Sequence, residues 1–369
     1  MTVKDIMGCI TAIAPLSWQE DYDNAGLQVG DLGAEVHKAL IALDVTEAVV
    51  NEALAKQCDL IVSHHPLIFK GLKHVTSRSF IERIVRKAIK HDLNIISMHT
   101  NLDNSYWGVS RVLAERLGLS HLEILDPMSG KLFKLVVFVP LEAADQVRQA
   151  MFAAGAGCIG NYDSCSFNVD GAGSFKAGEQ CHPYVGEIGE LHFERETRVE
   201  TVVPEHLLSD VIKAMKAVHP YEEVAYDVYP MQNDYPFAGA GMKGRYEVAL
   251  SETEFLQRAA EALGSPCLRH SALTGRKVTE VAVCGGSGAF LLSCAKRNHV
   301  DVFLTADIKY HDFFEPDGDL LMVDAGHFET EQFSKVLIKD LIQKKFPNFA
   351  AEIAETNTNS VHYFCKKQN

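Results

Sequence analysis

The stretch HKALIALDVTEAVVNEALAKQCDLIVSHHP, residues 37–66, decides the fold class of this chain. Its apolar run at 37–45 predicts a strand, and the residues that follow to position 57 have helical spacing, with Thr46 as the N-cap. Residues 58–63 form a short, continuously apolar run, which is typical of a strand buried inside a parallel sheet. Strand, helix and strand in this order predict a parallel α/β sheet with right-handed crossovers.

The same alternation continues on both sides of a different central segment. Near the start it predicts three further elements: a helix at 79–92, a strand at 93–99 and a helix at 108–119. Strands and helices alternate again after residue 240, and a last pair of strands is predicted at 352–358 and 361–367. We therefore predict three segments: the two halves of one α/β unit at 1–127 and 235–369, and an inserted α+β domain at 128–234.

The inserted segment has its own order of elements. A strand at 131–140 and a helix precede a glycine-rich stretch at 155–189, and the alternating run at 189–204 predicts a strand or hairpin. A helix at 205–220 and a strand at 224–230 complete the segment. This β-α-β-β-α-β order is typical of a ferredoxin-like fold.

The composition limits the class of protein. The chain has 369 residues, of which 47% are hydrophobic and 23% charged, as in ordinary globular proteins. It has no apolar run long enough to span a membrane and no basic start followed by an apolar block, so we predict neither a membrane span nor a signal peptide. Nine scattered cysteines without a C-x-x-C pair favour reduced thiols and a cytoplasmic location. The formal net charge of −14 argues against nucleic-acid binding.

Four predicted strand ends carry ionisable side chains. They are IVSHHP with His64 and His65, IISMHTNLD with His99 and Asp103, VFLTADIKYHD with Asp307 and His311, and LMVDAGHFETE with His327 and Glu331. Ligands collect at the carboxyl ends of strands in open parallel sheets, so these side chains can converge on one crevice. His327 and Glu331 are four residues apart and would share one face of a helix. Histidine and carboxylate ligands together suit Zn, Mn, Fe, Ni or Co, and the absence of H-E-x-x-H excludes a zincin site.

Each of these signals alone has a more ordinary explanation. A single histidine at a strand end is usually a capping or surface residue. An H-x-x-x-E pair on a helix is usually a solvated pair. Only the joint pattern of four strand ends predicts a metal site.

Two glycine-containing motifs leave alternatives open. CGGSGAF at 284–290 is either a phosphate-holding turn at a helix N-terminus or a tight turn that allows close packing, and we favour packing. Within it, Cys284 is the only candidate for a thiol nucleophile, and it lacks a local catalytic signature. DNAGLQVG at 23–30 either lines a site through Asp23 and Asn24 or forms a turn into an edge strand.

A further motif lies in the inserted segment. HPYEEVAYDVYP at 219–230 places His, Tyr and two acids at the start of a strand, which suits a small-molecule or metal cleft. The more ordinary explanation is a helix stop at Pro220 followed by a strand, and we favour it. The letters HPY recur at 182–184, but the residues around them do not repeat.

Taken together, the motifs resemble those of the Nif-three-like family, whose members are often named GTP cyclohydrolase 1 type 2 homologues. The resemblance rests on SHHP, HTNLD, CGGSGAF, TADIKYHD, DAGHFETE and DNAGLQVG, which occur in the family's order and cover both α/β segments. The insert, through HPYEEVAYDVYP, is similar to the domain carried by the longer bacterial members, which resembles the PII and CutA signalling folds. The resemblance also implies a toroidal homohexamer.

A dinuclear metal site is implied by the same resemblance. The residues that match the family's metal ligands are His64, His65, Asp103, His327 and Glu331. The family pattern places His65 and Asp103 on one ion. It places His64 and His327 on the other ion, with Glu331 bridging both.

Two hypotheses for the function follow from these residues. The first is a metal-dependent hydrolase of a nucleotide-like ring or a phosphoester, with His99 and His311 as catalytic proton carriers near the metals. The second is a regulatory or scaffold oligomer that senses a metal or a small ligand without catalysis. Two departures from the family pattern, Ala306 in place of glycine and GAF after CGGSG, touch no ligand but lie in loops that would define a substrate. The sequence leaves the substrate and the identity of the metal open.

Overall fold

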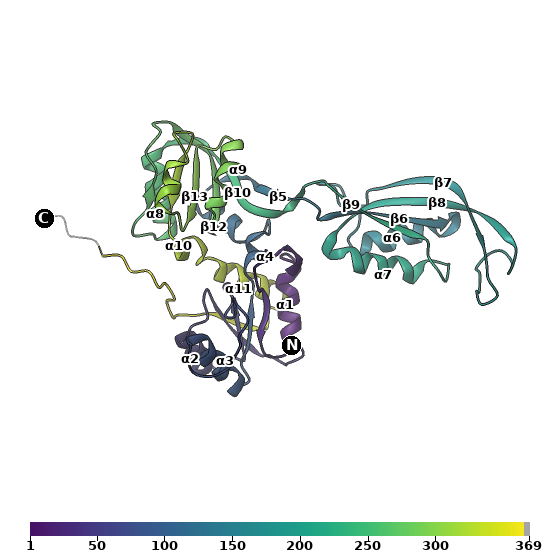
Figure 1. The fold of residues 1–369 in the computed structure, drawn as a ribbon, viewed down its shortest axis with the longest axis horizontal. Coiled ribbons are helices and arrows are strands. Elements are labelled where there is room, and N and C mark those ends of the chain that lie inside the picture. The colour runs from purple at the N-terminus through teal and green to yellow at the C-terminus, as the bar shows by residue number, and fades with distance from the viewer. Residues whose placement is uncertain (365–369) are drawn as a thin grey trace. The chain divides into compact units, whose positions relative to one another are not determined.

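The computed structural model describes residues 1–364 of the chain (Figure 1). These residues form two compact units. Unit 1 consists of residues 1–127 together with the chain from residue 236 onward, and unit 2 consists of residues 128–235. No helix in this part of the chain is long and apolar enough to cross a membrane.

Unit 1 contains a five-stranded sheet that is built from both ends of the chain. Its order is β1-β4-β3-β2-β15, in which the last four strands are parallel and β1 is antiparallel to β4. The strand bounds are β1 Gly26–Val29, β2 Lys38–Ala42, β3 Leu60–Ser63, β4 Asn94–Ser97 and β15 Ala350–Ile353. Helices α2 (Glu47–Ala55) and α3 (Phe80–Lys90) pack on one face, and α1 (Val3–Thr11) and α11 (Ser334–Lys345) pack on the other. Both faces are therefore buried, which explains the continuously apolar strands.

A second sheet in unit 1 has six strands in the order β11-β14-β13-β12-β10-β5. β12, β13 and β14 are parallel, whereas β10 is antiparallel to β12 and β11 is antiparallel to β14. The strand bounds are β5 Ser120–Met128, β10 Tyr235–Ser251, β11 Arg269–His270, β12 Lys277–Ser287, β13 Val302–Ala306 and β14 Leu321–Asp324. Helices α5 (Val109–Arg116) and α8 (Glu252–Leu263) pack on one face, and α9 (Leu292–Arg297) packs on the other.

The mixed α/β architecture is confirmed, but its division into two sheets was not predicted. Residues 120–128 were expected at the end of the first half, and they form the edge strand of the second sheet. Residues 350–353 return to the edge of the first sheet. Each half of unit 1 thus completes the sheet of the other, an arrangement that depends on pairing between distant segments.

The predicted last pair of strands is wrong in its second member. Residues 350–353 form β15, but the described residues 361–364 are in no strand, and residues 365–367 lie outside the described part. After β15, the backbone N–H groups of Glu355 and Thr356 donate to the carboxylate of Glu52. The chain therefore leaves the sheet at this point and is held by a side chain of α2.

Glu52 makes several contacts with this C-terminal segment. Its carboxylate also accepts a hydrogen bond from the Thr356 hydroxyl at 2.6 Å and pairs with Lys56 at 2.9 Å. Burial opposes ionisation of Glu52, but the bonds from Thr356 and Glu355 lower the pKa of the carboxyl from 4.5 to about 2. Glu52 is therefore ionised in the folded chain down to strongly acidic pH.

Glu52→Gln should lower the free energy of unfolding at pH 7 by about 1–3 kcal/mol, because hydrogen bonds to a charged group contribute more than neutral ones. The folded pKa lies below the unfolded one, so the advantage of the wild type is complete above pH 4.5 and is lost as the pH falls toward 2. Urea unfolding at pH 7, 4 and 3 measures both effects. Glu47→Gln is a control on the same helix. It removes an exposed ion pair with Arg83 and should lower the free energy of unfolding by less than about 1 kcal/mol. A loss that does not change with pH would contradict this explanation.

Unit 2 is a four-stranded antiparallel sheet with two helices on one face (Figure 1). Its elements are β6 Leu132–Pro140, α6 Ala144–Ala153, β7 Ser166–Lys176, β8 Leu191–Pro204, α7 Leu208–Val218 and β9 Tyr226–Met231. The strand order is β7-β8-β6-β9, and the elements occur in the predicted β-α-β-β-α-β order. α6 and α7 cover an apolar core on one face of the sheet. The other face carries exposed rings, among them Phe167 and Tyr229.

Candidate metal centre

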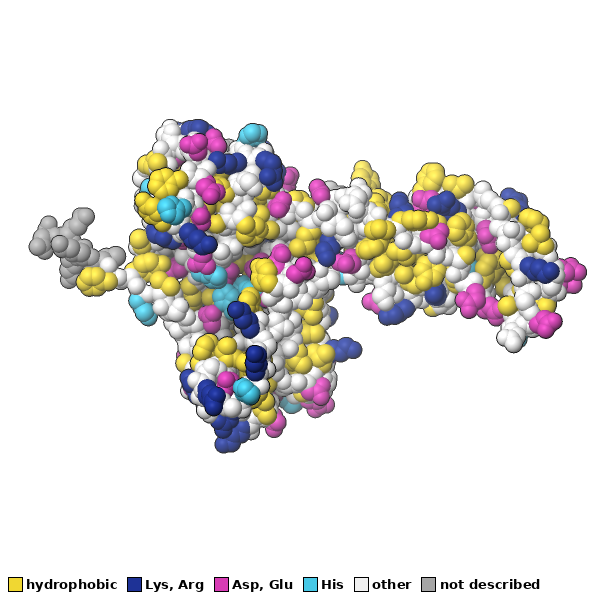
Figure 2. Space-filling view, viewed as in Figure 1, with side chains coloured by type: hydrophobic (Ala, Val, Ile, Leu, Met, Phe, Trp, Pro, Cys, Tyr) yellow, Lys and Arg dark blue, Asp and Glu magenta, His cyan; other side chains and the backbone are white. Residues whose placement is uncertain are grey.

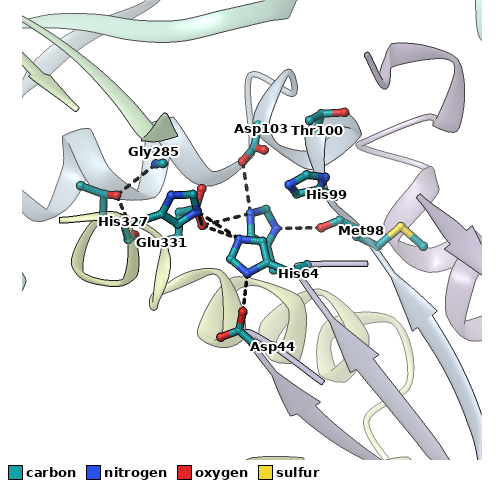
Figure 3. Close-up of polar contacts among 12 residues, drawn as sticks. Asp44, His64, Met98, His99, Thr100, Asp103, Gly285, His327 and Glu331 are labelled. Atoms are coloured by element: carbon teal, nitrogen blue, oxygen red, sulfur yellow. Dashed lines mark hydrogen bonds and ion pairs between the residues drawn. The ribbon is translucent and has the colours of Figure 1, made fainter. Parts of the chain in front are cut away.

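Loops and short helices of unit 1 bring imidazole and carboxylate groups together (Figure 3). The contributing elements are β3, β4 and the two short helices α4 (Thr100–Asp103) and α10 (His327–Glu331). The residues are His64 and His65 directly after β3, His99 after β4, Asp103 at the end of α4, and His327 and Glu331 at the two ends of α10. In the space-filling view, histidine side chains gather near the middle of unit 1 (Figure 2).

The two adjacent histidines do not point apart as they would in an extended strand. β3 ends at Ser63, and the N–H groups of His64 and His65 donate to the carbonyls of Ala42 and Leu43, at the end of β2. Their rings lie in the same cluster with centroids 5.0 Å apart. The alternation of side chains ends with the strand, so both imidazoles serve one site.

Glu331 lies at the centre of this cluster. Its Oε2 atom is 2.8 Å from His65 Nε2, 3.0 Å from His327 Nε2 and 3.7 Å from His64 Nε2. The Nε2 atoms of His65 and His327 are 3.3 Å apart. His64, His65 and Glu331 have ligand atoms that all lie within 4.8 Å of one another, so they are able to hold a metal ion.

Two buried atoms of the cluster have no hydrogen-bond partner in the described part of the chain. They are Nε2 of His64 and Oδ1 of Asp103, which lie 3.5 Å apart. Leaving a polar atom unpaired in the interior is costly, and native proteins avoid it. A divalent cation between an imidazole nitrogen and a carboxylate oxygen satisfies both atoms, so these residues fit a metal ion.

Every histidine of the cluster is oriented through its Nδ1 atom. In His64 this atom lies 2.8 Å from the carbonyl oxygen of Met98. In the other three it lies 2.7 Å from a carboxylate, in the pairs His65–Asp44, His99–Asp23 and His327–Asp307. A carbonyl or carboxylate acceptor keeps the proton on Nδ1 and leaves Nε2 free as a ligand, which is the usual arrangement for a metal-binding histidine (Figure 3).

Burial and mutual charge strongly shift the ionisable groups. Burial disfavours the charged form of His65, but hydrogen bonds with Asp44 and Glu331 raise its pKa to about 10. The His327 side chain is 38% exposed, and although partial burial opposes its charged form, its bond with Glu331 raises its pKa to about 9. Burial raises the pKa of Glu331, but the charge of His64 and the bond from His327 hold it well below 4.5. Since a metal ligand must be deprotonated, metal binding here would release protons.

A cavity of about 220 Å³ opens onto the cluster. The cluster residues on its wall are His99, Asp103, His327 and Glu331. Opposite groups on the wall include Tyr22 and the exposed ring of Phe290. Cys284 also lines the cavity, but burial raises the pKa of its thiol, so it is poorly suited to act as a nucleophile.

The glycines near the end of β12 serve close packing, the alternative favoured from the sequence. Gly286 has a φ of +61°, and a Cβ atom there would lie 2.1 Å from Oε1 of Glu331. Its N–H group donates to the hydroxyl of Thr330 at 3.0 Å, so it is not free to hold a phosphate. The turn therefore leaves room for the central carboxylate.

The structure places His311 outside the cluster. It is exposed in the 3-10 segment Tyr310–Phe314, and its ring contacts in the described chain are with Tyr310 and Phe314. After β13, Asp307 has a φ of +55°, and its own carboxylate reaches His327. Of the two predicted proton carriers, His99 borders the cluster and His311 does not.

Two of the carboxylates that orient histidines, Asp23 and Asp44, differ in how well the sequence predicts them. The segment 23–30 has both of the features offered as alternatives. Asp23 reaches the site, where it bonds His99 and the N–H group of Thr100, and the chain then enters the edge strand β1, while the Asn24 amide donates to the carbonyl of Ile68. Asp44 was not singled out. Its signal was present, because Asp44 lies two residues after the end of β2, as His65 lies two residues after the end of the neighbouring parallel strand β3.

Comparisons with known proteins agree over the whole chain. A profile of the family described as Duf34/NIF3 (NGG1p interacting factor 3) matches residues 1–360. A GTP cyclohydrolase 1 type 2 homolog from Halalkalibacterium halodurans is 39% identical over 352 residues, which cover 95% of this chain and 94% of that protein. A protein of the same name from Bacillus subtilis is 37% identical over 364 residues, covering 96% and 97%. The crystal structure of a Bacillus cereus protein related to NIF3 superposes with a TM-score of 0.87 at 36% identity and covers 99% of both chains.

Proposed function

The chain belongs to the Duf34/NIF3 family, and from this premise we propose that it is a hydrolase that depends on two divalent metal ions. The cluster of imidazole and carboxylate groups supports metal binding. The cavity beside the cluster supports catalysis. The relatives are named homologues of a GTP cyclohydrolase, which points to a nucleotide-like ring, and a phosphoester is the other substrate class that we propose.

Two pairs of ligand atoms lie at distances that suit a shared ion. Ligands about 2.1 Å from a tetrahedral ion lie about 3.4 Å apart. His64 Nε2 and Asp103 Oδ1, at 3.5 Å, suit one ion, and the Nε2 atoms of His65 and His327, at 3.3 Å, suit the other. Glu331 would bridge both. This pairing differs from the one implied by the family resemblance, which joins His65 with Asp103.

The residues around the cluster supply positioning and proton transfer. Bound metal would act as a Lewis acid that lowers the pKa of a water molecule and stabilises developing negative charge. His99 lines the cavity and is oriented by Asp23, so it is placed to accept and return a proton. Tyr22 and Phe290 wall the cavity and limit the access of bulk water to the reacting group.

The cavity is the observation that carries this proposal. A structural metal site is closed by its protein ligands, whereas a catalytic site keeps an open position. At about 220 Å³, the cavity is smaller than the usual pocket for a whole small molecule, about 300–1,000 Å³. It therefore suits the reacting part of a substrate, such as a phosphoryl group or the edge of a ring, with the rest outside.

A regulatory role without catalysis is the second candidate. A separate cavity of about 420 Å³ in unit 2 favours it, because a ligand site apart from the metals is what a sensor needs. The PII/CutA-like character of unit 2, the toroidal homohexamer and the cytoplasmic location rest on the resemblance and the composition, and they stay predictions.

His65→Ala should reduce the turnover of the metal-loaded chain at least about a hundredfold, because it removes a ligand from the centre of the cluster. The assay loads the protein separately with Zn, Mn, Fe, Co and Ni, and measures GTP ring opening and the hydrolysis of phosphomonoesters and phosphodiesters. His37→Ala is the matched control, because His37 also pairs with an aspartate but is remote and exposed. Metal binding without turnover on any substrate, or turnover that survives His65→Ala, would contradict the proposal.

A further inference from the structure

The two His-Pro-Tyr segments of unit 2 meet at one cavity of about 420 Å³. The carboxylate of Glu222 accepts a hydrogen bond from the N–H group of His182 at 2.8 Å, which ties the two segments together. Tyr184 and Tyr221, one from each segment, line the cavity with ring centroids 6.2 Å apart. The volume lies within the usual range for a small-molecule pocket, about 300–1,000 Å³.

His219 is a positioning residue for this cavity. Its Nε2 donates to the carbonyl of Phe138 at 3.0 Å, and its Nδ1 accepts from the N–H group of Tyr221 at 3.1 Å. Burial lowers the pKa of His219, in agreement with a neutral ring that makes both bonds. The motif therefore ends α7 and also fixes a tyrosine on the wall of the cavity.

Glu196 is a buried carboxylate on the same wall. The residue is only 9% exposed, and the Tyr221 hydroxyl donates a hydrogen bond to its Oε1 atom at 2.9 Å. Its Oε2 atom is not among the buried, unpartnered side-chain atoms of the described residues, which agrees with a carboxylate on the cavity wall. A Cβ atom at Gly173 would lie 2.2 Å from Oε2, so glycine leaves the space that this oxygen occupies. The residue is largely buried, and the one hydrogen bond to its carboxylate comes from a neutral hydroxyl, so a cation in the cavity would be a favourable partner for Oε2.

The other walls are aromatic and acidic. Four rings line the cavity, from Phe138, Phe175, Tyr184 and Tyr221. Three carboxylates, Glu196, Glu222 and Glu223, face a single ammonium group, that of Lys176. Lys176 is exposed and forms no ion pair with Glu196 in the described chain. Figure 2 shows hydrophobic and acidic side chains together on the surface of unit 2.

We propose that this cavity binds a small organic cation, a primary amine with an apolar or aromatic body. The ammonium group would bind Oε2 of Glu196, and the body would lie among the four rings, whose faces attract a cation and pack against apolar groups. A metal ion fits less well, because the other two carboxylates are exposed and the rings offer no ligand atoms. An anion is disfavoured by the excess of carboxylates.

Isothermal titration of the full chain with phenethylammonium chloride tests the proposal. The neutral analogue 2-phenylethanol has nearly the same shape and no charge. We expect the ammonium probe to bind at least about tenfold more tightly than the alcohol. Glu196→Gln keeps the size of the side chain, removes its charge, and should weaken binding of the ammonium probe at least about tenfold.

Two further variants keep the test decisive. Glu200→Gln, on the same strand but outside the cavity and paired with Arg198, should leave the affinity unchanged. If Glu196→Gln fails to fold by its thermal melting curve, Tyr184→Ala decides, because that exposed ring can be removed with little effect on the core and should weaken binding several-fold. Equal binding of the two probes, no binding of either in the millimolar range, or unchanged binding in Glu196→Gln would overturn the proposal.

Discussion

Glu331→Gln should weaken the binding of divalent metal at least about a hundredfold, since loss of even an outer partner of a metal ligand costs about 10–100-fold. Its Oε2 atom lies within 3.0 Å of the Nε2 atoms of His65 and His327 and 3.7 Å from that of His64. The amide has the same shape but no charge to offset a cation among three imidazoles. The expected result is a folded chain that has lost its metals, measured by metal titration with competing chelators.

Glu329→Gln is the matched control for this variant. Glu329 is on the same short helix and is also buried, but its carboxylate accepts a hydrogen bond from Asn359 and lies outside the cluster. Glu329→Gln should lower the free energy of unfolding and leave the affinity for metal unchanged. Similar metal affinities for the two variants would show that Glu331 is not a ligand.

Gly286→Ala should cost both stability and metal affinity. A left-handed φ of +61° is strained for alanine by about 1–2 kcal/mol. In addition, the new methyl group would lie 2.1 Å from Oε1 of Glu331 and 3.3 Å from Cε1 of His327, so the central carboxylate must move. We expect a total loss of about 2–4 kcal/mol in the free energy of unfolding, with metal affinity lowered at least about tenfold. Urea unfolding and metal titration measure the two effects.

Gly264→Ala separates the backbone cost from the displacement of Glu331. Gly264 ends α8 with a nearly identical φ of +64°, but a Cβ atom there has no neighbour within 4 Å among the described residues. Gly264→Ala should lower the free energy of unfolding only by the cost of the left-handed φ, about 1–2 kcal/mol, and should bind metal as the wild type does. Equal losses in both variants would mean that Glu331 can move without consequence.

The residues of the cluster could be predicted because an ionisable group directly after an apolar strand has few structural reasons to be there. Asp44 lies two residues after β2 and was missed, because the apolar run continues to Val45 and the strand was predicted to end there, whereas β2 ends at Ala42. Asp307 and His311 both follow β13, and only Asp307 reaches the cluster. This outcome depends on the left-handed φ at Asp307, which residue type alone does not determine.

The architecture of unit 1 was predictable only at the level of its repeating pattern. Strand and helix periodicity shows that an element exists, but it does not show which distant strand it pairs with. From sequence, β5 and β15 could belong to a sheet in either half. Only the pairing of β5 with β10 and of β15 with β2 creates two sheets. In unit 2, the recurrence of HPY had no explanation from sequence, because the link between its copies is a hydrogen bond from a backbone N–H group to Glu222.

The place of β15 at the edge of the first sheet has a consequence for biosynthesis. Its partner β2 ends at residue 42, whereas β15 begins at residue 350 and is made about 310 residues later. At about 5–20 residues per second, β2 waits for roughly fifteen seconds to a minute with an unpaired backbone edge, the kind of edge that recruits foreign strands. All four strands of unit 2 are complete well before then. A nascent chain therefore carries one sheet that has all its strands and another that is open to wrong partners. The cluster of imidazole and carboxylate groups cannot assemble until Glu331 has emerged.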